Sequence, residues 1–396
     1  RVPGARLAAM ARGPRRVAAL PAPVGGGADG GTRPNGLRVQ RVRVPLGVVA
    51  IIYENRPNVT SDAFGLCLKS GNAAFLRGSS GALQSNIAIA AALREGLAKA
   101  GLPEDCLVLV EDTSYDAAVE FMRLRQSIDV LIPRGGPKLI RSILDNATVP
   151  YVIDGDGNCH VYVDASADLE AAADIVVNAK TQRPSVCNAA ETLPVHRNVA
   201  ATFLTQVAPR LEGVELVGDQ ATQEILGDRV TALASDDDYA TEFLDLKLAV
   251  RVVDTLDAAI AHISRYGTGH SEAIVTTDLR AATRFTQEVD AAAVVVNAST
   301  RFVDGEELGF GAEIGISTQK LHARGPMGLR ELTTLKFVIQ GDGQIRTRTG
   351  ASVVAIVRTD TTIPAPEPTE QLLAGDTVVA VGTPEGLRAM RQLLGG

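Results

Sequence analysis

The sequence predicts an α/β fold built from two consecutive parallel-sheet units, followed by a small α+β module at the C-terminus. Continuously apolar stretches such as VVAIIYE (48–54) are typical of parallel strands that are buried on both faces. They alternate with helical segments such as 85–100, at the spacing of βαβ units. The same alternation starts again near residue 175, and the character of the chain changes after residue 346.

The N-terminal stretch is basic. The first 16 residues contain five arginines and no acidic residue. Such a composition is compatible with a transit peptide, whereas the helix-compatible spacing of RLAAMARGPRRVAAL, which leads directly into the fold, favours a helix. Because the chain begins with Arg, we expect residues 1–20 to be the remnant of a group of N-terminal helices.

Two segments are predicted to form exposed β-structure. In GGTRPNGLRVQRVRVPLG (30–47), Asn35-Gly36 is a preferred pair for a type I′ hairpin turn. The following LRVQRVRV alternates apolar and basic side chains, which is typical of a half-exposed ribbon that another subunit covers. The segment LTTLKFVIQGDGQIR (332–346) is predicted to be a further pair of strands with an Asp-Gly turn.

Composition and charge exclude several classes of function. The chain has 396 residues, 21% of them charged, and a formal net charge of -7, so electrostatics give no reason to expect nucleic acid or an anionic membrane as a partner. The longest apolar run, at 44–53, is about half the length that crosses a bilayer. The four cysteines (67, 106, 159 and 187) form neither a disulfide framework nor a metal-binding pattern. We expect a cytoplasmic, reduced protein without a bound metal or membrane insertion.

Two loops at the carboxyl ends of predicted strands are candidates for ligand binding. In IPRGGPKLI (132–140), Gly135 and Gly136 allow backbone amides to approach a phosphate at a helix N-terminus. In FLRGSSGA (75–82), Arg77 suits a ribose 2′-phosphate, with Ser80 beside it. No GxGxxG motif is present, so a plain glycine-rich turn and a solvated arginine are alternatives of similar weight.

Cys187 is the candidate nucleophile. It lies in TQRPSVCNAAET (181–192), a stretch too polar for a core strand, with Lys180 and Arg183 close in sequence. Nearby cations favour a reactive thiolate. No histidine is placed by its spacing to act as a base, and a small buried apolar cysteine is the competing interpretation.

Several long motifs resemble one known family. They are VPLGVVAIIYENRPNVTSDA, LCLKSGNAAFLRGSS, LIPRGG, NAKTQRPSVCNAAET, EFLDL, VNASTRF and GAEIGISTQKLHARGPMGL. Together they closely resemble the γ-glutamyl phosphate reductases, which belong to the aldehyde dehydrogenase superfamily, over about residues 20–346. The resemblance implies an aldehyde-dehydrogenase-like fold and NADPH-dependent reduction of γ-glutamyl phosphate to glutamate 5-semialdehyde, in proline biosynthesis.

The resemblance also implies roles for individual residues. Cys187 falls on the catalytic nucleophile, and Asn55 in YENRPN falls on an oxyanion-stabilising Asn, for which Asn58 is a rival. The expected NADPH-binding residues are Arg77, Ser80, Gly135, Gly136 and Glu242, the last holding the nicotinamide ribose. Candidates for binding the substrate anions are Asn58, Arg183, Arg301 and Arg324, because a guanidinium suits carboxylate and phosphate; a structural ion pair is the alternative for each arginine.

The implied mechanism passes through a thioester on Cys187. A hydrolytic aldehyde dehydrogenase needs a base that activates water, usually the Glu of a Glu-Leu-Gly-Gly motif, and the corresponding VIDGDGNCHVY lacks it. Its loss is consistent with phosphate, not water, exchanging with the thioester, although Asp154 or Asp156 remains a candidate base. His322 is expected to be structural rather than a proton donor.

The resemblance predicts the domain organisation and the partners. We expect oligomerisation arms at 21–45 and 332–346, an NADP-binding domain at 46–176 and a catalytic domain at 177–331. The oligomer is expected to be a homo-oligomer, and its substrate to come from glutamate 5-kinase.

Residues 350–396 resemble the C-terminal regulatory module of potassium-channel and cation-antiporter subunits, which binds small ligands and dimerises. The alternative function is therefore a catalytically impaired reductase body that serves as a ligand-binding regulatory subunit of a cation transporter. Glu306 and Leu308, in DGEELGFG, depart from the family's usual DGGEFGFG beside the expected substrate region.

Overall fold

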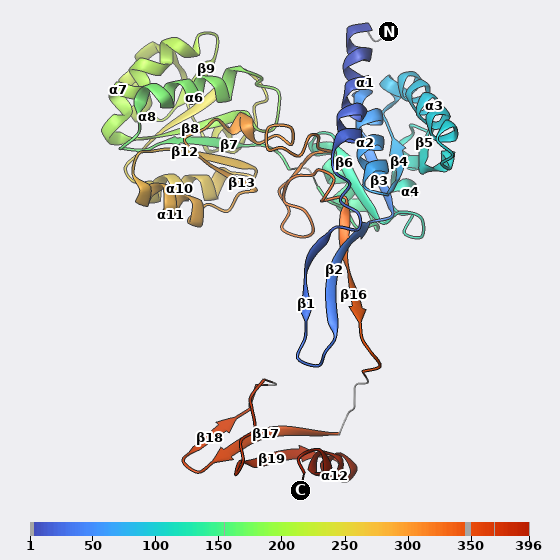
Figure 1. The fold of residues 1–396 in the computed structure, drawn as a ribbon. Coiled ribbons are helices and arrows are strands. Elements are labelled where there is room, and N and C mark those ends of the chain that lie inside the picture. Colours follow the sequence, from blue (N-terminus) through green and yellow to red (C-terminus); the bar gives the residue numbers. More distant parts are fainter. Residues whose placement is uncertain (1–3, 154, 345–349, 368, 396) are drawn as a thin grey trace. The chain divides into compact units, whose positions relative to one another are not determined.

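The computed structural model describes residues 4–153, 155–344, 350–367 and 369–395. Chain contacts divide it into two units, Arg1–Ala28 with Arg41–Lys336, and Asp29–Gln40 with Phe337–Gly396. The larger unit contains two parallel sheets (Figure 1). The helix α1 (Gly4–Ala19) precedes the first sheet, in agreement with the helix expected at the N-terminus.

The first sheet has four parallel strands in the order β5-β4-β3-β6. Its strands are β3 (Val48–Tyr53), β4 (Ala73–Arg77), β5 (Leu107–Val110) and β6 (Val130–Arg134). The connecting helices are α2 (Asn58–Lys69), α3 (Leu83–Lys99), α4 (Tyr115–Phe121) and α5 (Pro137–Asn146), with short 3₁₀ turns η1 (Ser80–Ala82) and η2 (Glu104–Cys106). The apolar run of β3 is buried on both faces, as the sequence predicts.

The second sheet has seven parallel strands in the order β10-β9-β11-β8-β7-β12-β13. Its strands are β7 (Cys159–Val163), β8 (Ala190–His196), β9 (Glu215–Gly218), β10 (Val230–Leu233), β11 (Lys247–Val253), β12 (Ser271–Val275) and β13 (Ala293–Val296). Helices α6 (Leu169–Thr181), α7 (Arg197–Val207) and α8 (Gln220–Leu226) pack on one face, and α10 (Leu256–Tyr266) and α11 (Leu279–Glu288) on the other (Figure 1). The short elements are η3 (Ala208–Leu211), η4 (Gly227–Arg229), α9 (Asp236–Ala240) and η5 (Thr300–Phe302).

The boundary between the two sheets differs from the expected domain boundary at residue 176. Strand β7 pairs with β8 and β12, so it belongs to the second sheet together with α6. Conversely, the segment around β14 (Ile316–Ser317) and β15 (Gly325–Pro326) contributes Ile314, Met327 and Leu329 to the core of the first sheet. Apolar runs identify strands, but they do not say which of two similar sheets a strand joins.

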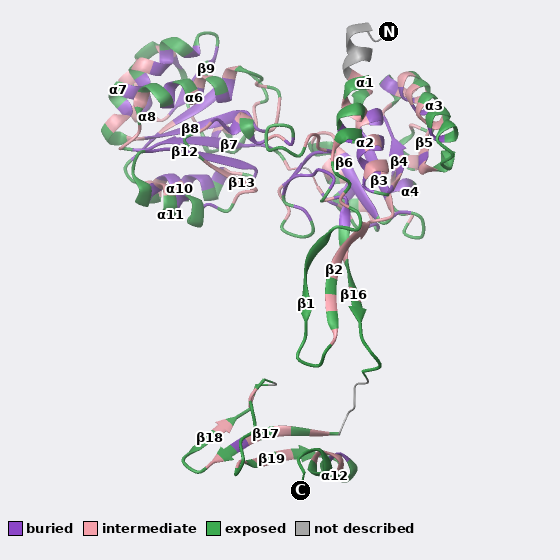
Figure 2. Cartoon of the chain, viewed as in Figure 1, coloured by how far each residue is buried: buried purple, intermediate pink, exposed green. Residues whose placement is uncertain are grey.

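The predicted hairpin forms, and a third strand extends it. Strands β1 (Gly27–Thr32) and β2 (Arg38–Pro45) flank a turn in which Gly36 has a φ of 83°, the left-handed conformation that favours glycine. Residues 332–346 were expected to be a pair of strands, but the described part contains one strand, β16 (Thr333–Gln340), which joins β2 in the order β1-β2-β16. Much of this arm is exposed (Figure 2), including Phe337 and Ile339.

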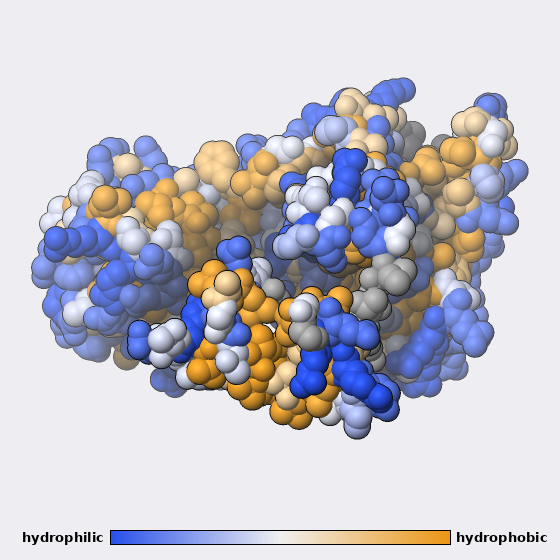
Figure 3. Space-filling model, turned by 60° about the horizontal axis from the view of Figure 1, so that its bottom comes forward, coloured by the Kyte–Doolittle hydropathy of each residue, from blue (hydrophilic) through white to orange (hydrophobic). Residues whose placement is uncertain are grey.

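The C-terminal module contains three strands and a helix, in agreement with the small α+β module that the sequence predicts. Strands β17 (Ala351–Arg358), β18 (Thr361–Pro364) and β19 (Thr377–Gly382) form an antiparallel sheet in the order β18-β17-β19, and α12 (Pro384–Leu393) follows. Four valines of β17 and β19 are exposed: Val354, Val357, Val379 and Val381. Hydrophobic residues also gather on the surface seen in Figure 3. Within the described residues, no helix has the length and apolar character that a membrane span requires.

Candidate active site

The loop between α6 and β8 carries Cys187, which is half-buried. The neighbouring Asn188 anchors this loop to the segment around η5: its side-chain amide donates to the carbonyl of Val303 at 2.9 Å, and its own carbonyl accepts from Thr300 Oγ1 at 2.7 Å. The thiol of Cys159, at the start of β7, donates to the carbonyl of Cys187 at 3.1 Å. The main chain at Cys187 and at the residue after it is thus fixed by other segments.

Gly157 lies directly against the main chain of Cys187. A Cβ atom at residue 157 would lie 1.6 Å from the carbonyl oxygen of Cys187 and 2.6 Å from its Cα atom. The amide of Gly157 donates to Glu242 Oε1 at 2.8 Å. Gly157 therefore connects two residues that the sequence places in the site, Cys187 and Glu242.

Arg301 lies within electrostatic range of the cysteine. Burial lowers the pKa of Arg301, and the carboxylate of Asp304 opposes this shift. The charges of Arg183 and Cys187 also act on Arg301, so Arg301 is coupled to each of them. Arg301 Nε donates to Gln182 Oε1 at 2.8 Å, which fixes its position beside the loop. Positive charge of this kind stabilises a thiolate.

The other substrate candidates are engaged elsewhere. Arg324 Nη2 contacts Asp290 Oδ1 at 2.8 Å, and Lys320 contacts the same carboxylate. Asn58, at the start of α2, donates to Asp62 Oδ2 at 3.2 Å. The structural alternative therefore has a concrete partner for Arg324, whereas Arg301 is coupled to the charges of Cys187 and Arg183.

The glycine loop after β6 binds a carboxylate of the protein itself. The amide of Gly136, the residue before α5, donates to Glu54 Oε1 at 3.2 Å. This carboxylate lies at a helix N-terminus, the position that suits a phosphate. A Cβ atom at Gly135 would approach Glu54 to 2.9 Å, whereas Gly136 faces open space. In this structure the amide of Gly136 is therefore bonded to Glu54 and not free for a phosphate.

The loop after β4 contains the other candidate cofactor residues. Arg77 is buried, and its Nη2 donates to the carbonyl of Ser114 at 2.6 Å, while its Nε is buried without a hydrogen-bond partner. Burial lowers the pKa of Arg77, and Asp112 opposes the shift. Ser80 is exposed at the start of η1. The exposed hydroxyl of Ser80 is a donor that a ribose or phosphate can accept from, whereas the Nε of Arg77 is enclosed by the protein.

Asn55 extends from the end of β3 and is exposed. Its side-chain oxygen accepts a hydrogen bond from Ser79 Oγ at 2.5 Å. This contact holds the amide among the loops of the first sheet, beside the η1 turn.

Asp156 and His322 make main-chain contacts. Asp154 lies outside the described residues, and the main-chain oxygen of Asp156 accepts from Thr268 Oγ1 at 2.5 Å. His322 has a φ of 67°, and its Nε2 lies 2.7 Å from the carbonyl of Glu331. The described residues contain no group of His, Cys, Asp or Glu side chains arranged to hold a metal ion.

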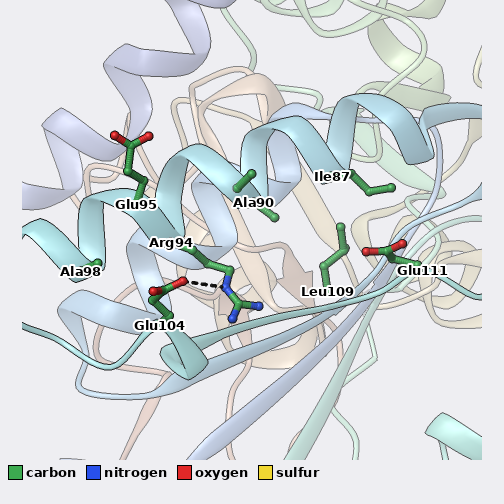
Figure 4. Close-up of a pocket in the computed structure, with 9 residues that line it drawn as sticks. Ile87, Ala90, Arg94, Glu95, Ala98, Glu104, Leu109 and Glu111 are labelled. Atoms are coloured by element: carbon green, nitrogen blue, oxygen red, sulfur yellow. Dashed lines mark ion pairs between the residues drawn. The ribbon is translucent and has the colours of Figure 1, made fainter.

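One pocket of about 490 Å³ lies away from these residues, between α3 and β5 (Figure 4). It is lined by alanines, Ile87 and Leu109, three glutamates, and Arg94, which pairs with Glu104 at 3.5 Å. None of the site residues predicted from the sequence lines it. The chemistry is therefore located by contacts around Cys187 and not by the size of a cavity.

Three structural features of the site were not identified from the sequence. They are the bridging Gly157, the thiol of Cys159, and a buried ion pair between Lys180 and Glu191. A signal for the pair was available, because Lys180 and Glu191 are two residues of opposite charge on either side of Cys187. Gly157 gave no comparable signal, since a glycine in a polar loop has many uses.

The two parallel sheets and the cysteine loop define a protein of the aldehyde dehydrogenase class. The model of the aldehyde dehydrogenase family matches residues 26–239, and that of the TrkA-C domain matches residues 341–395. The acetylating aldehyde dehydrogenase of Geobacillus thermoglucosidasius is 19% identical, with a TM-score of 0.64 over 78% of each chain, and shows the same fold.

Relatives of higher sequence identity show which family within this class the chain belongs to. The γ-glutamyl phosphate reductase of Carboxydothermus hydrogenoformans is 59% identical over 343 residues, which are 86% of this chain and 82% of the relative. The crystal structure of the Thermotoga maritima γ-glutamyl phosphate reductase is 51% identical, with a TM-score of 0.85, over 87% of this chain and 84% of that chain. The chain belongs to the γ-glutamyl phosphate reductase family.

Proposed function

We propose that the protein reduces γ-glutamyl phosphate to glutamate 5-semialdehyde and inorganic phosphate, with NADPH as reductant and Cys187 as nucleophile. The observation that carries the proposal is the cysteine loop itself, in which Cys187 is half-buried, its main chain is held by Cys159 and Gly157, and its charge is coupled to that of Arg301. The identity of more than half to reductases of this name, over most of the chain, supports the substrate.

The thiolate of Cys187 attacks the acyl carbon of the substrate. A C–S bond forms, the bond from carbon to the phosphate oxygen breaks, and phosphate leaves with its electron pair. Arg183 and Arg301 neutralise the phosphate or the α-carboxylate, because a guanidinium can bind either anion with two hydrogen bonds. The side-chain amide of Asn55 is assigned to the developing oxyanion, an effect typically worth about 3 kcal/mol in the transition state.

The cofactor is assigned to the loops of the first sheet. The amides at Gly135 and Gly136 would hold the phosphates, Arg77 and Ser80 the adenosine ribose, and Glu242 the nicotinamide ribose. When bound, the nicotinamide would supply the hydride that reduces the thioester. Cys187 then leaves as a thiolate when the aldehyde is released. The preference for NADPH over NADH is assigned to the positive charge of Arg77 at the end of β4.

The segment around Gly157 supports phosphate rather than water as the partner of the thioester. This segment stands where hydrolytic aldehyde dehydrogenases carry the motif with the catalytic base. Gly157 packs directly on the main chain of Cys187, and the amide of Gly157 donates to Glu242. The exposed three-stranded arm supports a homo-oligomer. An acyl phosphate hydrolyses readily in water, which supports direct supply by glutamate 5-kinase in the cytoplasm.

The alternative function is a regulatory subunit of a cation transporter with an impaired reductase body. The match to the TrkA-C domain favours a regulatory role for residues 341–395, but the reductase relatives cover 86% of the chain and favour the enzyme. We therefore assign the module to regulation of an active reductase.

The nucleophile is tested with two cysteine variants. The substitution Cys187→Ser is expected to abolish turnover of glutamate 5-semialdehyde with NADP⁺ and phosphate. The control is Cys106→Ser, a half-buried cysteine in η2 at the edge of the first sheet, which is expected to retain activity. Full activity of the Cys187→Ser variant, with an unchanged circular dichroism spectrum, contradicts the assignment.

A further inference from the structure

A buried ion pair lies beneath the candidate active site. Lys180 Nζ contacts Glu191 Oε2 at 2.6 Å, and both side chains are fully buried. Lys180 is in the last turn of α6 and Glu191 is at the start of β8, so the pair brackets the Cys187 loop. A buried pair is weak evidence for stability, because apolar side chains of similar volume often stabilise a protein as well. The pair therefore calls for a role other than stability.

The second oxygen of Glu191 reaches a loop that the ion pair does not otherwise touch. Glu191 Oε1 accepts from the amide of Leu244 at 3.2 Å. Leu244 has a φ of 55°, a left-handed conformation that side-chain-bearing residues adopt only where the surroundings enforce it. Leu244 is 44% exposed, so packing of its side chain does not enforce the conformation. Two contacts hold the main chain here: the hydrogen bond to Glu191, and the packing of the adjacent Phe243 against the core around Tyr239.

Leu244 follows Glu242 by two residues, and Glu242 is the residue assigned to the nicotinamide ribose. Its Oε1 accepts from the amide of Gly157, which is packed on the main chain of Cys187. The contacts form a continuous path from Lys180 through Glu191 and Leu244 to Glu242, and from there to the nucleophile loop. The charge of Glu242 acts on Glu191, whose pKa burial raises to about 7.

We propose that Lys180 and Glu191 are positioning residues for the loop 241–246, which they hold so that Glu242 meets the cofactor at a fixed distance from Cys187. Lys180 keeps the carboxylate of Glu191 oriented, and Glu191 fixes the main chain of Leu244. The inference rests on the proposed function, since it takes the role of Glu242 from there. Neither residue contacts substrate or cofactor in this account; both act through Glu242.

Two double variants separate positioning from folding. The variant Lys180→Met with Glu191→Gln removes both charges but keeps an oxygen for the amide of Leu244. The variant Lys180→Met with Glu191→Leu removes the charges and the oxygen at a similar side-chain volume. Both avoid a single unpaired charge in the core, which is the usual cause of misfolding when one partner of a buried pair is replaced.

The measurements are the dissociation constant for NADPH, followed by nucleotide fluorescence, the KM for NADP⁺, and the thermal midpoint. We expect the Glu191→Leu double variant to bind NADPH about tenfold more weakly than the Glu191→Gln double variant, the effect of one lost hydrogen bond. The dissociation constant of the Glu191→Gln double variant for NADPH is expected to lie within about twofold of that of the unchanged chain. The two double variants are expected to have similar thermal midpoints. Equal dissociation constants for the two double variants overturn the inference.

The failure of the proposed function gives a different result. If the unchanged chain binds NADPH but does not turn over glutamate 5-semialdehyde with phosphate, the proposed reaction is wrong, and the two NADPH dissociation constants still decide the role of the pair. If the unchanged chain does not bind NADPH, both the reaction and the inference are overturned.

Discussion

The substitution Gly157→Ala tests whether the position of the Cys187 loop depends on the close contact between Gly157 and the main chain of Cys187. The added Cβ atom would lie 1.6 Å from the carbonyl oxygen of Cys187, whereas Cβ atoms essentially never come closer than 3.0 Å to another heavy atom. The loop must therefore move by the difference, about 1.4 Å, because the obstructing atoms belong to the main chain and have no rotamer to change. A displacement of about 1 Å can reduce the rate of an enzyme about a hundredfold.

The assay is steady-state oxidation of glutamate 5-semialdehyde with NADP⁺ and phosphate. We expect kcat/KM to fall at least about a hundredfold, and the free energy of unfolding to fall by about 1–3 kcal/mol because of overpacking. The control is Gly96→Ala, on the exposed side of α3, where a Cβ atom meets nothing within 4 Å. This change is expected to stabilise the helix by about 0.5–1 kcal/mol without affecting activity. A Gly157→Ala variant with unchanged kcat/KM refutes the reasoning.

Two further predictions concern the anion site and a buried histidine. Arg301→Ala is expected to raise the KM for phosphate about tenfold, since Arg301 is coupled to Cys187, whereas Arg324→Ala, whose guanidinium is paired with Asp290, is expected to change it less than about twofold; the opposite order contradicts the assignment. His270 is buried, and burial lowers its pKa to about 4, below its value in the unfolded chain. The unfolded state therefore binds more protons between pH 6.5 and pH 4, and stability is lost as the pH falls through this window, with a slope of up to about 1.4 kcal/mol per pH unit from this group. Urea titrations at several pH values measure the slope, which is expected to be shallower in His270→Gln; identical slopes in both proteins argue against this role of His270.

Most of the fold could be predicted from the sequence, because its signals are local. The apolar run of β3 and the turn glycine Gly36 each determine a conformation through their own side chains, or the lack of one. The assignment of β7 to the second sheet could not be predicted in this way. It depends on pairing with β8 and β12, and an apolar strand has the same appearance in either sheet.

The candidate site shows the same division. Cys187 and Glu242 were predicted from motifs, and the structure connects them through Gly157. The bridging role of Gly157 depends on a contact between segments that are 30 residues and more apart, which no local pattern encodes. The ion pair of Lys180 and Glu191 was predictable in part. The sequence shows the two charged residues on either side of Cys187, but it does not show that they pair with each other.

In the proposed reaction phosphate, and not water, exchanges with a thioester on Cys187. The most direct test is the oxidation of glutamate 5-semialdehyde by NADP⁺ in the presence and absence of inorganic phosphate, with the product identified as acyl phosphate or free glutamate. We predict that oxidation of glutamate 5-semialdehyde depends strictly on phosphate and is lost in Cys187→Ser. Turnover to glutamate at an undiminished rate without phosphate would contradict it.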